Sequence, residues 1–259
     1  MEKILLLAIL ICLYLSSMAG TVEASNTSAQ VSYQLDWSDE FNGSSIDSSN
    51  WNFEVGGGGW GNNELEYYTD SNDNAHIEAG NLIIEARKEP YDGNDYTSAR
   101  LTTQGKHEFQ YGKIEARMKL PIGQGLWPAF WMLNTDGSTY GEIDIMEQVN
   151  LENNIYGSAH WGYHGRRSTT GSYDNIDVTE YQIYSVIWNE SSIAWYIDNN
   201  KYYEVVLDKN SMSAFHEPFY IILNLAIGGS WPGNPDASTQ FPARVYVDWI
   251  RVYCTARSF

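Results

Sequence analysis

Short runs in which apolar and polar residues alternate recur along this chain, and they limit its fold more than any other feature. Residues 114–120 form the clearest run, because every second residue is apolar and the residues between are charged. Successive side chains of a β-strand point to opposite faces, so this run predicts a strand with one buried face. Clusters of Gly, Asn, Asp and Pro separate such runs, as at 56–59, 92–95, 198–200 and 232–235. No long stretch after residue 24 has helical periodicity, so the chain is predicted to be all-β, either a sandwich or a barrel.

The N-terminal residues have the composition of a secretory signal peptide. A short charged start precedes an apolar run, and small residues follow. The run is shorter than the roughly 20 apolar residues that span a bilayer. We therefore expect residues 1–24 to be a signal peptide, cleaved after Gly20 or Ala24, and residues 25–259 to be one secreted, extracellular domain. Its one remaining cysteine, Cys254, cannot form an internal disulfide.

The charge and the aromatic content favour a neutral polysaccharide as partner. The chain carries 33 acidic and 15 basic residues, a net charge of −18. This charge repels phosphate backbones and anionic membranes, so we expect no nucleic-acid partner and no membrane partner. The 10 Trp and 19 Tyr residues offer flat rings with a polar group, which suit a neutral sugar, although most of them should lie in the core. We expect the protein to act as a monomer.

Three carboxylates lie close together in GEIDIMEQVN, residues 141–150. Glu142 and Asp144 are two positions apart and share a strand face. Glu147 would point to the other face unless a β-bulge that includes Met146 shifts the alternation by one residue. The apolar residues between the acids argue against a solvated edge strand. Hydrolysis of a glycosidic bond with retention requires two carboxyl groups about 5–5.5 Å apart, so this strand is the candidate catalytic element.

This strand resembles the E-x-D-x-(x)-E strand of family 16 glycoside hydrolases, the group of endo-β-1,3-glucanases (laminarinases), licheninases, agarases and carrageenases. The resemblance implies that Glu142 is the nucleophile, that Glu147 is the acid/base and that Asp144 lies between them. It extends over most of the chain, through GGGGWGNNELEYYT at 56–69 and NLAIGGSWPGNPD at 224–236 to VYVDWIRVY near the C-terminus. It also implies a fold, an antiparallel β-jelly-roll sandwich with a concave substrate cleft.

Several side chains outside this strand are candidates for binding sugar. In the glycine-rich segment, Trp60 offers a stacking face and Asn63 an amide that both donates and accepts hydrogen bonds. In GLWPAFWML, Trp127 and Trp131 are four positions apart and share a strand face, with core packing as the alternative interpretation. An apolar platform there would raise the pKa of Glu147 by desolvation, as a general acid requires.

The resemblance implies sugar contacts for three further residues. Arg100 in YTSAR would contact bound sugar, unless it makes a surface salt bridge instead. His160 in SAHW would donate to a sugar hydroxyl or to Asp144. Trp231 in the GGSWPG loop would stack on a sugar ring, unless it packs in the core.

No cofactor is expected for catalysis, because the sequence contains no His-Glu-x-x-His motif and no pair of cysteines with metal-binding spacing. Some members of the family hold a structural calcium on the convex side of the sandwich. The positions that match their ligands are Gly80 and Asp248, with Glu40 as a third ligand.

The resemblance implies a secreted, retaining endo-β-1,3-glucanase. Two alternatives remain open: the same machinery acting on mixed-linkage β-1,3-1,4-glucan or agar, and a non-catalytic β-glucan-binding protein. Licheninases typically lack the inserted residue, so Met146 argues against their activity, and agarases have cleft loops unlike those of this chain. Non-catalytic relatives lose the acids, whereas Glu142 and Glu147 are both present.

Overall fold

The computed structural model describes residues 32–162 and 166–255. The predicted signal peptide (1–24) and the first residues of the predicted domain lie outside the described residues. Within the two described ranges, no helix has both the length and the apolar character needed to cross a membrane.

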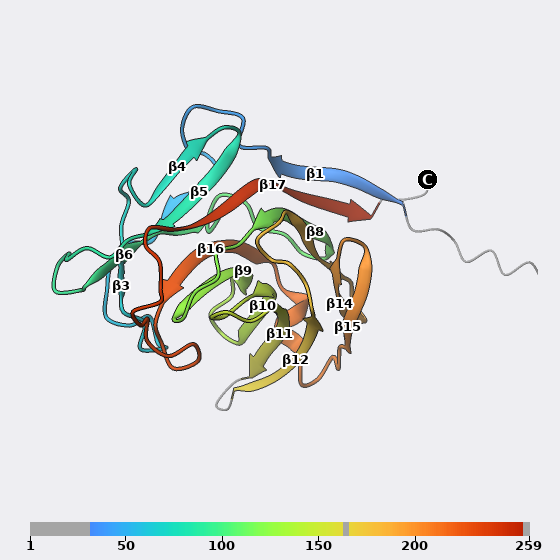
Figure 1. Ribbon diagram of the computed structural model, residues 1–259. Helices are drawn as coiled ribbons and strands as arrows, with labels where there is room; N and C mark the ends of the chain where they lie inside the picture. The colour runs from blue at the N-terminus through green and yellow to red at the C-terminus, as the bar shows by residue number, and fades with distance from the viewer. Residues whose placement is uncertain (1–31, 163–165, 256–259) are drawn as a thin grey trace, which may run out of the picture. The chain divides into compact units, whose positions relative to one another are not determined.

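Two large sheets contain nearly all of the described strands, and neighbouring strands within each are antiparallel (Figure 1). The first sheet runs in the order β15 (Asn200–Val206), β14 (Ser192–Ile197), β13 (Gln182–Trp188), β8 (Gly112–Lys119), β17 (Ala243–Thr255), β5 (Asn81–Ala86) and β4 (Ala75–Glu78), and β1 (Tyr33–Asp39) also pairs with β17. The second sheet runs in the order β12 (Arg167–Asp174), β11 (Asn154–Gly162), β10 (Tyr140–Glu147), β9 (Leu126–Asn134), β16 (Phe219–Ile227), β7 (Arg100–Thr102) and β2 (Asn52–Phe53). A short parallel pair, β3 (Glu66–Tyr68) with β6 (Tyr96–Ser98), and a 3₁₀ helix, η1 (Ser213–His216), complete the described elements.

One apolar core lies between the two sheets, with side chains from both. In β8, Ile114, Ala116 and Met118 are buried, whereas Arg117 and Lys119 remain partly exposed. The alternation in the sequence therefore directs one face of β8 into the core. Two separate sheets around a shared core confirm the predicted antiparallel β-sandwich over the alternative of a barrel.

Strand β16 is buried on both faces over its whole length. The side chains on one face of β16, such as Leu223 and Leu225, belong to the core between the sheets. The side chains on the opposite face of β16 include Asn224 and Ala226, which line a cavity on the outer face of the second sheet. The outer face of β16 is therefore the floor of the candidate site.

Two loops that are far apart in the sequence are joined beside this floor. They are the glycine-rich loop before β3 and the loop that follows β16. The Leu65 N–H donates to the Ile227 carbonyl oxygen at 2.7 Å, and the Ser230 N–H donates to the Asn62 carbonyl oxygen at 2.7 Å. These bonds fix the position of one loop relative to the other.

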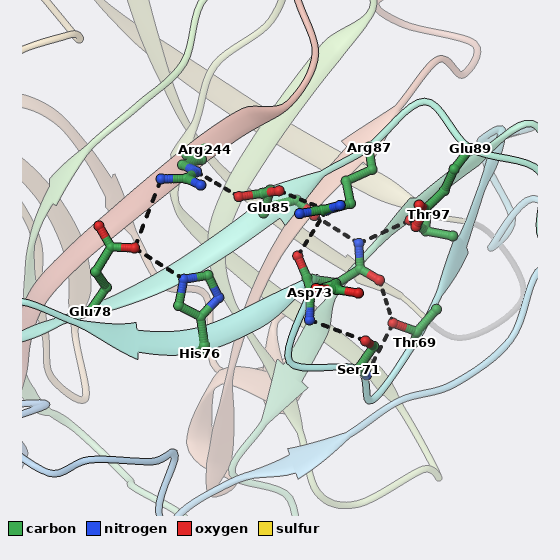
Figure 2. Close-up of polar contacts among 11 residues, drawn as sticks. Thr69, Ser71, Asp73, His76, Glu78, Glu85, Arg87, Glu89, Thr97 and Arg244 are labelled. Carbon is green, nitrogen blue, oxygen red and sulfur yellow. Dashed lines mark hydrogen bonds and ion pairs between the residues drawn. The ribbon is translucent and has the colours of Figure 1, made fainter.

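A buried polar network fixes the chain after β3, and Figure 2 shows the residues around it. The Asn74 amide donates to the Glu85 carbonyl oxygen and to the Thr97 hydroxyl, both at 3.0 Å. The Glu85 carboxylate, itself buried, pairs with Arg87 at 2.7 Å and with Arg244 at 2.6 Å. The network ties the turn after β3 to β5, β6 and β17, so it anchors the strand that leads out of the glycine-rich loop.

Candidate active site

Strand β10 carries the three predicted acids, and a β-bulge places them on one face. Asp144 and Met146 pair with consecutive residues of β9, so Ile145 between them has no partner there. Ile145 and Met146 are both buried in the core. The predicted bulge is therefore present, and Glu147 returns to the face of the other two acids. All three acids line one cavity.

The acids lie where two cavities on the second sheet meet. The first has a volume of about 270 Å³ and is lined by β9, β10, β16 and the glycine-rich loop. The second, of about 330 Å³, shares Glu142 and Glu147 with the first and extends to His160 and Thr170 on β11 and β12. Cavities on both sides of the acids can hold a chain on both sides of a scissile bond. This is the arrangement that an endo-acting enzyme needs.

Glu142 and Asp144 form a close pair with His160 beside them. The Tyr140 hydroxyl donates a hydrogen bond to Oε2 of Glu142. The Nε2 atom of His160 lies 3.0 Å from Oδ2 of Asp144 and 3.7 Å from Oε1 of Glu142. No group of the described chain directs a hydrogen bond at this Asp144 oxygen, so the imidazole is a close neighbour rather than a donor to it. Burial, and then the negative charge of Glu142, raises the pKa of Asp144 well above its ordinary value, so the pair holds one proton.

The surroundings of Glu147 favour its protonated form. Burial, followed by the negative charge of the Asp144–Glu142 pair, raises the pKa of Glu147 well above its ordinary value. The indole N–H of Trp127 donates to Oε1 of Glu147 at 3.0 Å, and this hydrogen bond lowers the pKa of Glu147. The sequence predicted that the indole platform would raise this pKa; burial does so, whereas the hydrogen bond from Trp127 lowers it. A carboxyl group kept protonated near neutral pH meets the requirement for a general acid.

Arg100 lies between two indole rings in the first cavity. Its guanidinium carbon is 4.9 Å from the centre of the Trp60 ring and 4.7 Å from the centre of the Trp131 ring. Its Nε atom pairs with the carboxylate of Glu54. Arg100 is therefore ion-paired, as one interpretation of the sequence held, and still lines the cavity, as the other requires.

Trp127 and Trp231 form the aromatic wall of the second cavity. Their rings are nearly perpendicular, with centres 5.4 Å apart, and Trp231 also packs edge-on against Tyr156. Trp231 is 44% exposed, so the alternative that it packs in the core is wrong. Trp231 lines the same cavity as Glu147, where its ring can stack on a sugar.

The structure separates two neighbouring amides in the glycine-rich loop. Asn63, which the sequence predicted to face the sugar, lines neither cavity; its amide donates to the Ser230 hydroxyl at 2.9 Å. Asn62 lines both cavities, and its amide donates to Oε1 of Glu64 at 2.9 Å. Asn63 has a φ of 61°, in the left-handed region, and this local turn separates the directions of the two side chains. His160, by contrast, lines the second cavity as predicted.

Several other residues line the cavities without having been predicted, among them Tyr140, Asn224, Glu64 and Arg166. Tyr140 lies two positions before Glu142, so strand alternation was sufficient to place it on the same face. Asn224 is the one amide in the apolar run of β16, which was also a usable signal. Glu64 and Arg166 had no such signal. The guanidinium carbon of Arg166 lies 4.5 Å from the centre of the Tyr140 ring.

Two of the three residues predicted to hold calcium have carboxylates that pair with arginines. Glu40 accepts two hydrogen bonds from Arg251, at 2.9 and 2.8 Å, and Asp248 pairs with Arg117 at 2.6 Å. Gly80 lies in the turn between β4 and β5. Each carboxylate already has a cationic partner, and a calcium ion would have to displace both arginines. Calcium binding at these residues stays a prediction.

The fold and the site together define a class of protein. An antiparallel β-sandwich holds three carboxyl groups in a cleft, two of them with raised pKa values, beside indole rings and amides that suit a sugar. These features define a glycoside hydrolase. The sequence profile of glycosyl hydrolases family 16 matches residues 60–251, and the chain belongs to this family.

Individual relatives agree with this assignment. The chain is 41% identical over 243 residues to a beta-glucanase of Rhodothermus marinus, with 85% of each protein covered. The structure superimposes on the catalytic domain of an endo-1,3-beta-glucanase (laminarinase) from Thermotoga petrophila with a TM-score of 0.80 and 45% identity, covering 88% of this chain and all of that domain. The clotting factor G alpha subunit of Tachypleus tridentatus is also 45% identical, over 239 residues, and the chain spans 34% of its length.

Proposed function

We propose that this protein is a secreted endo-β-1,3-glucanase that hydrolyses a neutral, laminarin-like glucan with retention of configuration. One observation carries the proposal: a bulged strand presents Glu142 and Glu147 in the same cavity, and burial favours the protonated form of Glu147. A retaining hydrolase needs this combination of a nucleophile and a protonated acid. The relatives named beta-glucanase and laminarinase support β-1,3-glucan as the substrate.

The proposed reaction consists of two displacements. In the first, a carboxylate oxygen of Glu142 attacks the anomeric carbon, the glycosidic bond breaks, and the proton of Glu147 passes to the leaving oxygen. The sugar is then an ester of Glu142. In the second, ionised Glu147 takes a proton from water, the water oxygen attacks the anomeric carbon, and Glu142 is released. Tyr140 holds one oxygen of Glu142 and so orients the nucleophile.

The lining of the cleft supports a neutral substrate. Its large apolar surfaces are the indole rings of Trp60, Trp127, Trp131 and Trp231. Of the two arginines that line the cavities, Arg100 is already paired with a carboxylate. With a net charge of −18, the chain offers little attraction to a sulfated or uronate polymer. We further propose that the protein acts outside the cell, on the basis of the signal peptide predicted from the sequence of residues 1–24, and that it acts there as a monomer.

Product analysis on laminarin, curdlan, barley β-glucan and agarose, run side by side, tests the substrate. We expect laminarin and curdlan to release oligosaccharides whose new reducing ends form first as the β-anomer, and agarose to remain intact. Cleavage of barley glucan or agarose without cleavage of laminarin would overturn the proposed linkage.

Variants of the two glutamates test the assigned roles. Glu142→Gln and Glu147→Gln should each remove nearly all activity while the protein stays folded. Azide should rescue Glu142→Ala and give the α-glycosyl azide, whereas with Glu147→Ala it should give the β-glycosyl azide. The opposite pairing of products would exchange the two roles.

A further inference from the structure

A second pair of carboxyl groups lies below the cleft, away from the catalytic strand. Glu66 is fully buried, and Glu64, two positions before it and 8% exposed, lines the first cavity. The Ile227 N–H donates to Oε2 of Glu66 at 2.6 Å. The other oxygen, Oε1, receives no hydrogen bond from the described residues, and the carboxyl group of Glu64 is its neighbour. Two adjacent buried carboxyl groups do not both ionise readily, so the pair shares a proton.

A chain of hydrogen bonds determines which carboxyl group holds the proton. The indole N–H of Trp131 can only donate, and it donates to Oδ1 of Asn224 at 2.7 Å. The Asn224 amide then donates to the Tyr68 oxygen at 3.1 Å, which leaves the Tyr68 hydrogen for Oε2 of Glu64 at 3.2 Å. Every bond in this chain points toward Glu64. Glu64 is therefore the ionised acceptor, and the shared proton lies on Glu66.

Glu64 also holds the amide that faces both cavities. Asn62 donates to Oε1 of Glu64 at 2.9 Å. The carbonyl oxygen of Asn62 accepts hydrogen bonds from the backbone and the hydroxyl of Ser230, at 2.7 and 3.0 Å. If Glu64 moves, it therefore shifts Asn62 and the two joined loops that Asn62 connects. It also shifts Tyr68, which is hydrogen-bonded to Asn224 in the floor of the cleft.

We propose that protonated Glu66 is a positioning residue that makes glucan binding depend on pH, separately from the catalytic acids. While Glu66 keeps its proton, its O–H donates to Glu64, and Glu64 holds Asn62 in the cleft. Loss of the proton places two negative charges side by side in a buried position. Glu64 then turns away from Glu66 and releases Asn62, so sugar binding weakens while Glu142 and Glu147 stay in place. This role rests on the proposed glucanase function.

The charged and titratable groups around Glu66 favour this behaviour. Burial, and then the charge of Glu64 and a hydrogen bond with it, raises the pKa of Glu66 well above its ordinary value. Tyr68 on the same strand has its own pKa raised by burial and by both glutamates, so it remains a hydrogen-bond donor. The positive charge of Arg100 on β7 lowers the pKa of Tyr68. The Ile227 N–H from β16 favours the ionised form of Glu66, but burial outweighs it.

The first test measures KM for laminari-oligosaccharides from about pH 6 to about pH 9, the range in which a buried Glu titrates. For the unmodified protein we expect KM to rise about tenfold, the effect of losing one hydrogen bond to a charged group. In Glu66→Gln the amide still donates to Glu64 and accepts from Ile227 but does not titrate, so KM should stay constant. Glu115→Gln, a buried carboxyl group of β8 in the other sheet, is the matched control and should keep the rise. A rise in KM in Glu66→Gln equal to that of the unmodified protein would overturn the proposal.

Glu64→Gln provides a second variant in case Glu66→Gln fails to fold. It removes the charge beside Glu66, so the dependence of KM on pH should disappear. The constant KM should lie above that of the unmodified protein at low pH, because Asn62 loses its charged partner. Persistence of the rise in this variant would also overturn the proposal.

Binding without turnover separates this proposal from the proposed function. In the Glu142→Gln background, the fluorescence of the cleft tryptophans reports the dissociation constant of laminari-oligosaccharides over the same pH range. A constant that rises with pH, and that no longer rises once Glu66→Gln is added, supports the proposal. Tight binding with no dependence on pH overturns the role of Glu66 and leaves the glucanase function intact. Absence of binding at every pH overturns the proposed substrate and, with it, this role.

Discussion

Replacing Trp127 with phenylalanine should move the alkaline limb of the pH–kcat profile upward by about one pH unit. The indole N–H donates to Glu147 at 3.0 Å and favours its ionised form, so its removal raises the pKa of Glu147 further. A hydrogen bond to a charged group contributes about 1.5–3 kcal/mol, and about 1.4 kcal/mol corresponds to one pKa unit. The lower end of this range applies because Trp127 and Glu147 both line the cleft, where a water molecule can replace the indole N–H in the variant. The first displacement requires protonated Glu147, so a higher pKa carries activity to higher pH.

The assay follows kcat on a laminari-oligosaccharide as a function of pH, because kcat reports ionisations in the enzyme–substrate complex. Trp131→Phe is the matched control: it also removes an indole N–H from the cleft, but this N–H donates to Asn224 rather than to a catalytic acid. Trp131→Phe should therefore lower activity without moving the limb. A limb that stays in place or moves downward in Trp127→Phe would refute the argument that the indole hydrogen bond acts on Glu147.

Three further predictions concern stability and specificity. Burial raises the pKa values of Glu66, Asp144 and Glu147, so the folded state binds more protons than the unfolded state, and the free energy of unfolding should fall as the pH rises above about 4.3. Urea titrations at several pH values measure this slope; a rise in stability between about pH 5 and about pH 8 would contradict it. Glu85→Ala should cost about 3 kcal/mol of unfolding free energy, the lower end for a buried ion pair, because Arg87 and Arg244 are about a third exposed. Glu78→Ala, at a side chain that is 55% exposed, should cost less than about 1 kcal/mol, and equal losses would show that burial of Glu85 has no special role. Deleting Met146 should lower activity on every glucan, since the residues after it shift by roughly 3.3 Å along the strand; a gain of mixed-linkage activity with loss of laminarin cleavage would assign specificity to β10.

The parts of the site that could be predicted from the sequence are those whose evidence is local. Glu142 and Glu147 are five positions apart, which places them on opposite faces of a regular strand, and only a bulge brings them together. The sequence therefore contained enough information to predict the bulge. The same alternation applied to Tyr140 would have predicted its contact with Glu142.

Other parts depend on backbone conformation or on distant residues and could not be predicted in this way. The sequence Asn62–Asn63 does not specify which amide faces the cleft, because the left-handed φ of Asn63 arises in the folded loop. In the sequence, Glu66 is an ordinary residue of a short strand. Its environment depends on Ile227, which is 161 positions away. No local pattern contains such information.

The order of the strands also constrains when the protein can fold. The last two described strands, β16 and β17, lie in the interior of the two sheets: β16 between β9 and β7, and β17 between β8 and β5. During synthesis, neither sheet can close until residues 219–255 have been added, because the earlier strands on either side of each gap have no partner across it. The growing chain therefore carries unpaired strand edges and an open apolar core until residues 219–255 have been synthesised. A chain that stops before residue 219 should accordingly aggregate instead of forming a smaller stable domain.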